Sequence, residues 1–288
     1  MIKPCFFIFT FLVLKMEIEL DLSKTIEENA AAYFDKAKEA KKRVSGHKRA
    51  LLILEQKAKE KEIAAEKKAS ESALVKENKS RKKKWYEQFR WFFSSDNLLV
   101  VGGKDAQSNE QIVKNRMQKN DVYFHAEVFG APHCFIQAPE KLSGREFVPP
   151  ESTMLEAAEF AVTFSKAWEE KRPQADAYSV KPEQVSKSTK SGESMGTGAF
   201  MIYGERNWFK KTPLSCAIGF FTRDKILMCA PLSAVKKHCT FFIELKQGEV
   251  TKEQIAKQLK EIFQKKGHTF AIDEFVSVMP AGSFSLKI

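Results

Sequence analysis

Residues 23–84 are the part of the sequence that most restricts the fold. They contain no proline and a single glycine, Gly46, and they are dominated by Ala, Lys, Glu, Leu and Gln, which are strong helix formers. Ser23 or Thr25 can cap such a helix. Apolar residues recur too loosely for a clean heptad pattern. We therefore expect a long helical coiled-coil arm, or a helical hairpin divided near Gly46, with a thin apolar face that needs a partner.

The positive charge of the chain is concentrated in this arm. The whole sequence has 48 Lys and Arg against 37 Asp and Glu, a net charge of +11, and residues 1–84 hold 21 against 13. A dense run at residues 79–84 closes the arm. Because cationic side chains next to phosphates release counterions, this pattern favours a nucleic-acid partner first and a membrane surface second. A solvated helix end explains the run equally well.

The N-terminal tail, residues 1–22, has an uncertain status. Its apolar stretch, residues 5–14, is shorter than the roughly 20 residues that a membrane span needs, and no small-residue cleavage site follows. We expect no membrane association, and we interpret residues 1–15 as a strand, a tail or a gene-model artefact. The five cysteines have no paired spacing, which indicates reduced thiols in a cytoplasmic protein.

The segment after Trp85 mixes strand and helix patterns, which indicates the α+β class. We expect strands at 98–101, 121–128, 134–138, 199–203, 217–221 and 226–229. We expect helices at 105–119 and 154–171, and a long functional loop at 172–198. A last unit should contain a strand at 241–245, a helix at 251–266 and a strand at 275–280.

Two short segments of this region are candidates for contact with an anion. Lys104 and Asp105 follow a strand and two glycines and open a helix, where free amides can receive a phosphate. No nucleotide-binding motif matches, and Asp105 as a helix N-cap is the favoured alternative. His125 ends a strand and is interpreted as a hydrogen-bonding or RNA-contacting side chain. His133 and Cys134 lie nearby, but no second ligand cluster accompanies them, so we expect no zinc site.

Basic and hydroxyl groups continue in the second half of this region. The loop that starts at Gln184 contains Ser186 and Lys187, and both a solvated loop and a phosphate-binding loop fit its composition. Residues 206–211 combine Arg206 and Lys210 with aromatic side chains that can stack on unpaired bases. For the other aromatic cluster we favour a place in the core, and this applies to Trp85, Phe89, Trp91 and Phe92.

Six sequence blocks, in the same order, resemble the NFACT-R domain of the NFACT family, which includes the NEMF- and RqcH-type ribosome quality-control proteins. The blocks are WYEQFRWFFSS at 85–95, VGGKDAQSNE at 101–110, DVYFHAEVFGA at 121–131, VPP at 148–150, QVSKS at 184–188 and TGAFMIYG at 197–204. Residues 18–23 and 32–38 resemble the start of the family's coiled-coil arm. The sequence departs from the family pattern at Lys104, where the family has Arg, at Phe129, where it has a second His, and at Tyr178 and Ser179, where it has two tryptophans.

The resemblance implies four parts: a tail at 1–22, a basic helical coiled-coil arm at 23–84, an NFACT-R-like RNA-binding domain of mixed α and β structure at 85–225, and a strand–helix–strand extension at 226–288. It implies binding to large ribosomal subunits that carry stalled peptidyl-tRNA, through rRNA and tRNA. It also implies recruitment of a Listerin-type ubiquitin ligase during the rescue of stalled ribosomes. The family's NFACT-N domain, which carries residues essential for C-terminal tailing, is not in this sequence, so tailing is not carried over.

We therefore expect a non-enzymatic RNA-binding protein of ribosome quality control, with no catalytic residue, metal or cofactor. The predicted RNA-contacting residues are Lys104, Asp105, His125, Gln184, Ser186, Lys187, Arg206 and Lys210. Two alternatives stay open. One is a nucleic-acid-processing enzyme that uses His125, Asp105 and Lys187, and the other is a coiled-coil adaptor without RNA specificity.

Overall fold

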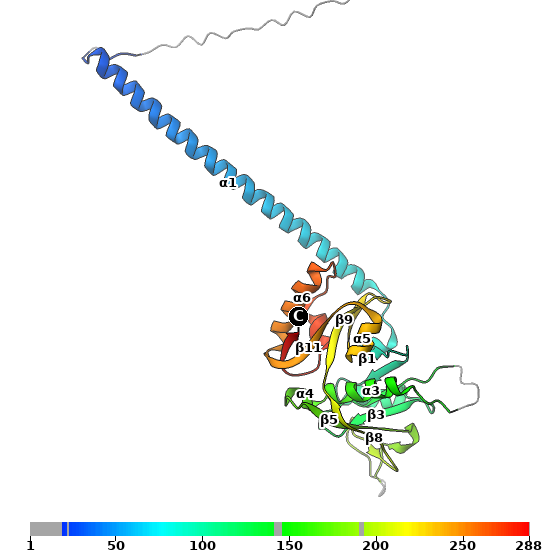
Figure 1. The fold of residues 1–288 in the computed structure, drawn as a ribbon. Helices are drawn as coiled ribbons and strands as arrows, with labels where there is room; N and C mark the ends of the chain where they lie inside the picture. The colour runs from blue at the N-terminus through cyan, green and yellow to red at the C-terminus, as the bar shows by residue number, and fades with distance from the viewer. Residues whose placement is uncertain (1–18, 22, 141–145, 190–192, 288) are drawn as a thin grey trace, which may run out of the picture. The chain divides into compact units, whose positions relative to one another are not determined.

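The computed structural model describes residues 19–21, 23–140, 146–189 and 193–287, and it has the expected α+β architecture (Figure 1). The prediction for residues 1–15 falls outside the described residues. The chain divides into two compact units, residues 1–70 and 71–288, each of which is considered by itself. Within the described residues, no helix is both long enough and apolar enough to cross a membrane.

Helix α1 (Ile26–Ser80) is the expected arm. It is continuous through Gly46, so the alternative of a hairpin divided at this residue is wrong. One glycine costs a helix only about 1 kcal/mol, and the many good helix formers around it outweigh that loss. From residue 30 to residue 62 its side chains are exposed, including the apolar run Leu51, Leu52, Ile53 and Leu54. This agrees with the thin apolar face inferred from the sequence.

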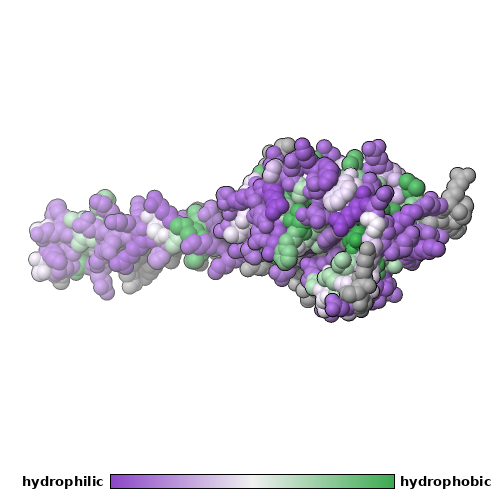
Figure 2. Space-filling view, turned by 90° about the horizontal axis from the view of Figure 1, so that it is seen from below, coloured by the Kyte–Doolittle hydropathy of each residue, from purple (hydrophilic) through white to green (hydrophobic). Residues whose placement is uncertain are grey.

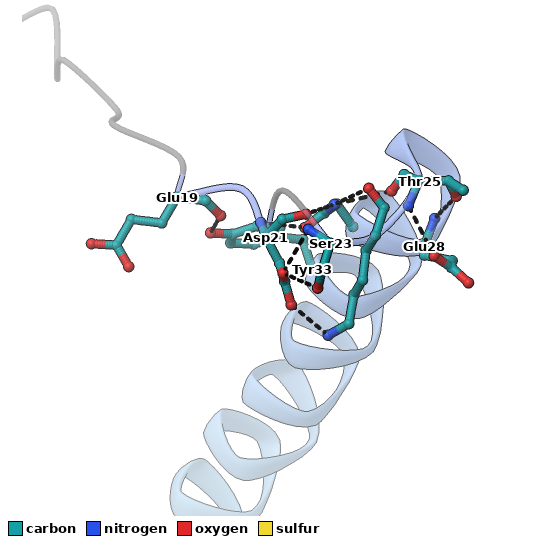
Figure 3. Close-up of polar contacts among 8 residues, drawn as sticks. Glu19, Asp21, Ser23, Thr25, Glu28 and Tyr33 are labelled. Atoms are coloured by element: carbon teal, nitrogen blue, oxygen red, sulfur yellow. Dashed lines mark hydrogen bonds and ion pairs between the residues drawn. The ribbon is translucent and has the colours of Figure 1, made fainter.

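The N-terminus of α1 is closed by a network of side-chain hydrogen bonds (Figure 3). Thr25 Oγ1 accepts from the Glu28 amide at 3.2 Å, and the Glu28 carboxylate accepts from the Thr25 amide at 2.9 Å, which is a capping box. Thr25 is therefore the cap, rather than Ser23. The preceding chain folds back onto the helix, where the buried Asn29 donates to Asp21 O at 3.0 Å and accepts from its amide at 2.9 Å.

The first sheet of the C-terminal unit is antiparallel and has the strand order β1-β2-β4-β3-β5-β8 among the described residues. The strands are β1 (Arg90–Phe93), β2 (Leu99–Gly102), β3 (Val122–Ala126), β4 (Cys134–Ile136), β5 (Gln174–Val180) and β8 (Asn207–Pro213). The expected loop at 172–198 is wrong in its first part, which forms β5. This stretch lies in a segment that is polar as a whole, and it forms a strand because β3 and β8 pair with its backbone on both sides.

Helices connect and cover this sheet. α2 (Ala106–Asn115) follows β2, and α3 (Glu151–Thr163) packs on β3, β4, β5 and β8 before the short α4 (Lys166–Glu169). Two short 3-10 helices, η1 (Trp85–Gln88) and η2 (Pro182–Gln184), and a ribbon of β6 (Val185–Ser186) and β7 (Met201–Ile202) complete this part. Helix α3 ends earlier than predicted, at Thr163, and its buried Phe160 lies 4.9 Å from Phe92, ring centroid to centroid.

The second sheet has the order β10-β9-β11-β12, from β9 (Cys216–Phe221), β10 (Ile226–Ala230), β11 (Cys239–Val250) and β12 (Phe284–Lys287). It is accompanied by α5 (Leu232–His238), α6 (Lys252–Lys265) and α7 (Ile272–Val278). The strand predicted at 275–280 is wrong, because α7 occupies this stretch. The carboxylate of Glu274 accepts from the Ala271 amide at 2.7 Å, and the resulting cap starts a helix. The domain boundary predicted between 225 and 226 stays a prediction, although β9 and β10 pair across it.

The aromatic segment after Trp85 lies in the core, as predicted. Phe89, Trp91 and Phe92 are buried, and Trp85 packs partly buried against the same cluster. Figure 2 shows a mostly hydrophilic surface with small, separate hydrophobic patches. In the C-terminal unit the described large apolar side chains that remain exposed are Phe129, Val148, Leu155 and Trp208.

Candidate nucleic-acid interface

A pocket of about 850 Å³ lies within the C-terminal unit, where β3, β4 and β5 meet the start of α2 and the segment 197–202. Four of the eight predicted site residues line it, and they are Lys104, Asp105, His125 and Arg206. These positions are separated by up to about a hundred residues in the chain, so only the folded sheet brings them together. The pocket is the candidate site.

Asp105 forms the N-cap of α2, as the favoured interpretation of the sequence held. Its carboxylate accepts from the Ser108 amide at 2.8 Å, and Ser108 Oγ accepts from the amides of Lys104 and Asp105. Hydrogen bonds from Ser108 lower the pKa of Asp105. A negative charge therefore already occupies this helix terminus, which disfavours a phosphate there. The neighbouring Lys104 is exposed on the pocket wall.

A stack of aromatic rings forms one wall of the pocket. His125 and His133 lie 4.4 Å apart, ring centroid to centroid, and Tyr123 Oη is 2.5 Å from His133 Nδ1. Phe200 meets His133 edge-on at 5.1 Å. Burial lowers the pKa of His125 and lowers the pKa of His133 to about 3. Both imidazoles are therefore neutral near pH 7, and the positive charge of the pocket comes from its lysine and arginine side chains.

Arg206 connects the pocket to an exposed tryptophan on β8. Its guanidinium lies 4.4 Å from the ring centroid of Tyr178 and 5.5 Å from that of Trp208, and it forms an ion pair with Glu127 at 3.1 Å. Lys210 Nζ lies 4.0 Å from the Trp208 centroid. We call Arg206, Trp208 and Lys210 the Trp208 platform. Because β8 is the edge strand and its side chains alternate, Trp208 is 38% exposed while the next residue, Phe209, packs partly buried against the core.

The remaining predicted residues, Gln184, Ser186 and Lys187, do not line this pocket. Gln184 Nε2 donates to the carbonyls of Tyr203 and Glu205, and Ser186 Oγ donates to Ser188 O. These contacts hold the segment between η2 and β8 in place.

Lys187 is likewise held by its neighbours. Its ammonium pairs with Glu110 at 2.5 Å and donates to the carbonyls of Gly196 and Ala199. Ion pairs with Lys114 and Lys187, together with the Gly198 amide, lower the pKa of Glu110 to about 2. Lys187 therefore positions the segment that closes the pocket.

The residues of the enzyme alternative are not assembled as a catalytic set. Asp105 is used as a helix cap, Lys187 is tied to Glu110, and His125 is a neutral ring that contacts the carbonyl of Pro132 at 3.1 Å. Among the residues described, no three His, Cys, Asp or Glu side chains converge as metal ligands would.

Sequence reasoning missed several residues that line the pocket, above all Arg90 and Phe200. Arg90 lies inside an aromatic run that predicts core, and no local pattern distinguishes it. His133 was considered only as a metal ligand, although its aromatic neighbour in the pocket, His125, was identified.

Gly198 allows the 197–202 segment to approach α2 closely. Its φ is +74°, and an added Cβ would lie 2.6 Å from both Cα and O of Ala106. We expect Gly198→Ala to lower the free energy of unfolding by about 1–3 kcal/mol, because the segment must move away from α2. Gly196→Ala is the matched control, since a Cβ there meets nothing within 4 Å. Equal denaturation midpoints for the two variants would contradict this role.

The NFACT protein RNA binding domain is the family model that matches this chain, over residues 88–204, and this match includes most of the pocket. The archaeal Rqc2 homolog aRqcH of Methanocaldococcus jannaschii is 37% identical over 213 residues, which are 73% of this chain. The chain belongs to the NFACT family. The resemblance identified in the sequence is thereby confirmed.

Two further NFACT relatives have names that refer to ribosome quality control. The ribosome quality control complex subunit NEMF homolog of Drosophila melanogaster is 39% identical over 70% of this chain, and subunit NEMF of Homo sapiens is 36% identical over 67%. The chain spans 30% of the archaeal relative, 20% of the fly relative and 17% of the human relative. In this NFACT protein, Arg206, Trp208 and Lys210 lie just beyond the residues that the family model matches.

Proposed function

We propose that this chain binds RNA through the pocket and the Trp208 platform, as an RNA-binding component of ribosome quality control. One observation carries the proposal. Within the unit that contains the NFACT RNA-binding domain, the cations Lys104 and Arg206 line a pocket of about 850 Å³, and Arg206 also flanks a half-exposed tryptophan. Cations that follow the backbone and aromatic faces that receive bases are the groups that bind single-stranded RNA.

The geometry favours unpaired RNA over a duplex. The pocket volume lies within the range of about 300–1,000 Å³ that is typical of small-ligand sites, so one nucleotide has room to enter it. Trp208 offers its ring at the edge of the sheet, where a base can stack on it. Base pairs in an A-form helix are already stacked and present no free face to such a ring.

The partners proposed for the chain follow from the family resemblance that the sequence blocks carry, and the relatives' names support only the general role in ribosome quality control. We propose that it contacts rRNA and tRNA on large ribosomal subunits that carry stalled peptidyl-tRNA, in the cytoplasm, and that it catalyses no reaction. We assign contact with a Listerin-type ubiquitin ligase to α1, where the side chains of Leu51, Leu52, Ile53 and Leu54 are each more than half exposed. Lys104, Asp105, His125, Gln184, Ser186, Lys187, Arg206 and Lys210 stay predictions as RNA-contacting residues.

Co-sedimentation of the full chain with large ribosomal subunits tests this function. We expect binding at 50 mM salt and a loss of affinity of roughly 10- to 100-fold at 200 mM, because three to four neutralised phosphates of a single strand give a slope of about −2 to −3 in a plot of log K against log salt. Small ribosomal subunits and an RNA duplex serve as controls and should bind more weakly. Absence of binding to ribosomal particles and tRNA at low salt would contradict the proposal.

A further inference from the structure

Two cations lie together behind the pocket. Arg90 belongs to β1, Lys252 opens α6, and both donate to one acceptor. Arg90 Nη1 lies 3.3 Å from Met279 O, and Lys252 Nζ lies 3.0 Å from the same oxygen. Burial lowers the pKa of Arg90, and burial followed by the charge of Arg90 lowers the pKa of Lys252 to about 8. The surroundings of both side chains therefore disfavour positive charge.

Neither cation has an acidic partner among the residues that the structure describes, where every ion pair involves other side chains. The shared carbonyl follows the end of α7 and offers only a partial negative charge. Two half-buried cations without an ion-pair partner are unfavourable for a fold, and an anionic ligand would offset part of that cost.

Arg90 also faces the pocket. Arg90 and Lys104 both line the pocket of about 850 Å³ and also an adjoining cavity of about 50 Å³. Phe164 lines both as well, and its ring centroid lies 4.6 Å from Arg90 Cζ. The contact with the aromatic ring leaves the guanidinium N–H groups that do not donate to Met279 O available for a phosphate.

We propose that Arg90 and Lys104 bind one phosphate group of an RNA strand, with Lys252 adding positive charge behind Arg90. The inference rests on the proposed RNA-binding function and adds to it the place where the strand is anchored. The amide end of α2 is not part of this site, because the Asp105 carboxylate already accepts from Ser108 there. The phosphate is held by side chains only.

The first test measures binding of a labelled single-stranded RNA of about 12 nucleotides to the full chain. Arg90→Met keeps apolar contact with Phe164 and removes the charge. We expect about tenfold weaker binding and a salt slope smaller by about 0.7, which corresponds to one phosphate. The free variant should melt at the same temperature or higher, since a cation without a counter-charge has been removed. Unchanged affinity and slope would overturn the site and leave Arg90 as a cap of α7.

A second measurement decides the matter if Arg90→Met does not fold. Inorganic phosphate should raise the melting temperature of the unsubstituted chain above that in chloride of the same ionic strength, and Lys104→Gln should abolish the rise. Lys257→Gln, an exposed position on α6, is the matched control and should keep it. No rise in the unsubstituted chain would overturn the proposal.

The two experiments separate the inference from the function on which it rests. RNA binding that is unaffected by Arg90→Met and Lys104→Gln disproves the phosphate site and leaves RNA binding intact. If inorganic phosphate stabilises the chain but the chain binds no RNA, the anion site stands and the RNA-binding function is disproved.

Discussion

Replacing Trp208 with alanine is expected to weaken binding of single-stranded RNA by about tenfold or more, because base stacking on an aromatic side chain contributes roughly 1–3 kcal/mol per base. The ring is 38% exposed, and Arg206 and Lys210 lie over it at 5.5 Å and 4.0 Å from its centroid. These cations strengthen stacking by drawing a nucleotide's phosphates to the same place. Fluorescence anisotropy with a short labelled RNA measures the effect.

Two controls make the Trp208 result specific. Trp208→Phe keeps an aromatic face and should retain most of the affinity. Leu155→Ala removes another exposed apolar side chain of the same unit, on α3, and should leave the affinity unchanged. Duplex RNA should bind the Trp208→Ala variant and the unsubstituted chain alike. If Trp208→Ala bound single-stranded RNA as tightly as Trp208→Phe, the platform would have no part in recognition.

Glu159→Gln is expected to raise the free energy of unfolding by roughly 1–3 kcal/mol at pH 8 and to change it little at pH 5. Glu159 lies on α3, where Ser215 Oγ donates to its carboxylate. Burial raises the pKa of Glu159 from 4.5 to about 7, and the neighbouring Glu156 also raises it. The folded chain therefore holds a proton that the unfolded chain releases.

The sign of the pH effect follows from this raised pKa. The stability contributed by protonated Glu159 is fully present below pH 4.5 and is lost as the pH rises through about 7. Glutamine imitates the protonated form at every pH, so the variant should lose this part of the pH dependence. Denaturant titrations between pH 5 and 8 measure it, with the exposed Glu261→Gln as control. Parallel stability curves for Glu159→Gln and the unsubstituted chain would contradict the assignment.

Local signals predicted a large part of the fold. Runs of good helix formers with a capping residue identified α1 and α6, and Thr25 and Thr251 form caps through side-chain contacts within three residues. The N-cap role of Asp105 was predicted for the same reason. Such features depend on neighbours close in the sequence, so the sequence contains all of the information that they need.

Elements that depend on distant partners were missed. β5 lies in a segment that is polar as a whole, and it forms because β3 and β8 supply its hydrogen bonds. α7 forms where a strand was expected because Glu274 caps it and Phe275 enters the core. The candidate site shows the same contrast between local and long-range information. Lys104, His125 and Arg206 were identified by type, but no pattern showed that they share one pocket or that Arg90 lies beside Lys104.

By itself, the sequence determined the basic helical arm, the α+β class, the aromatic core and membership of the NFACT family, because composition, periodicity and ordered motifs are properties of neighbouring residues. Only the tertiary structure decided the roles of the polar side chains. Gln184 and Lys187 hold the fold through hydrogen bonds and an ion pair, whereas Lys104 and Arg206 face a cavity. The reason is physical: a lysine's role depends on the acid or the open space beside it, and folding brings that neighbour from elsewhere in the chain.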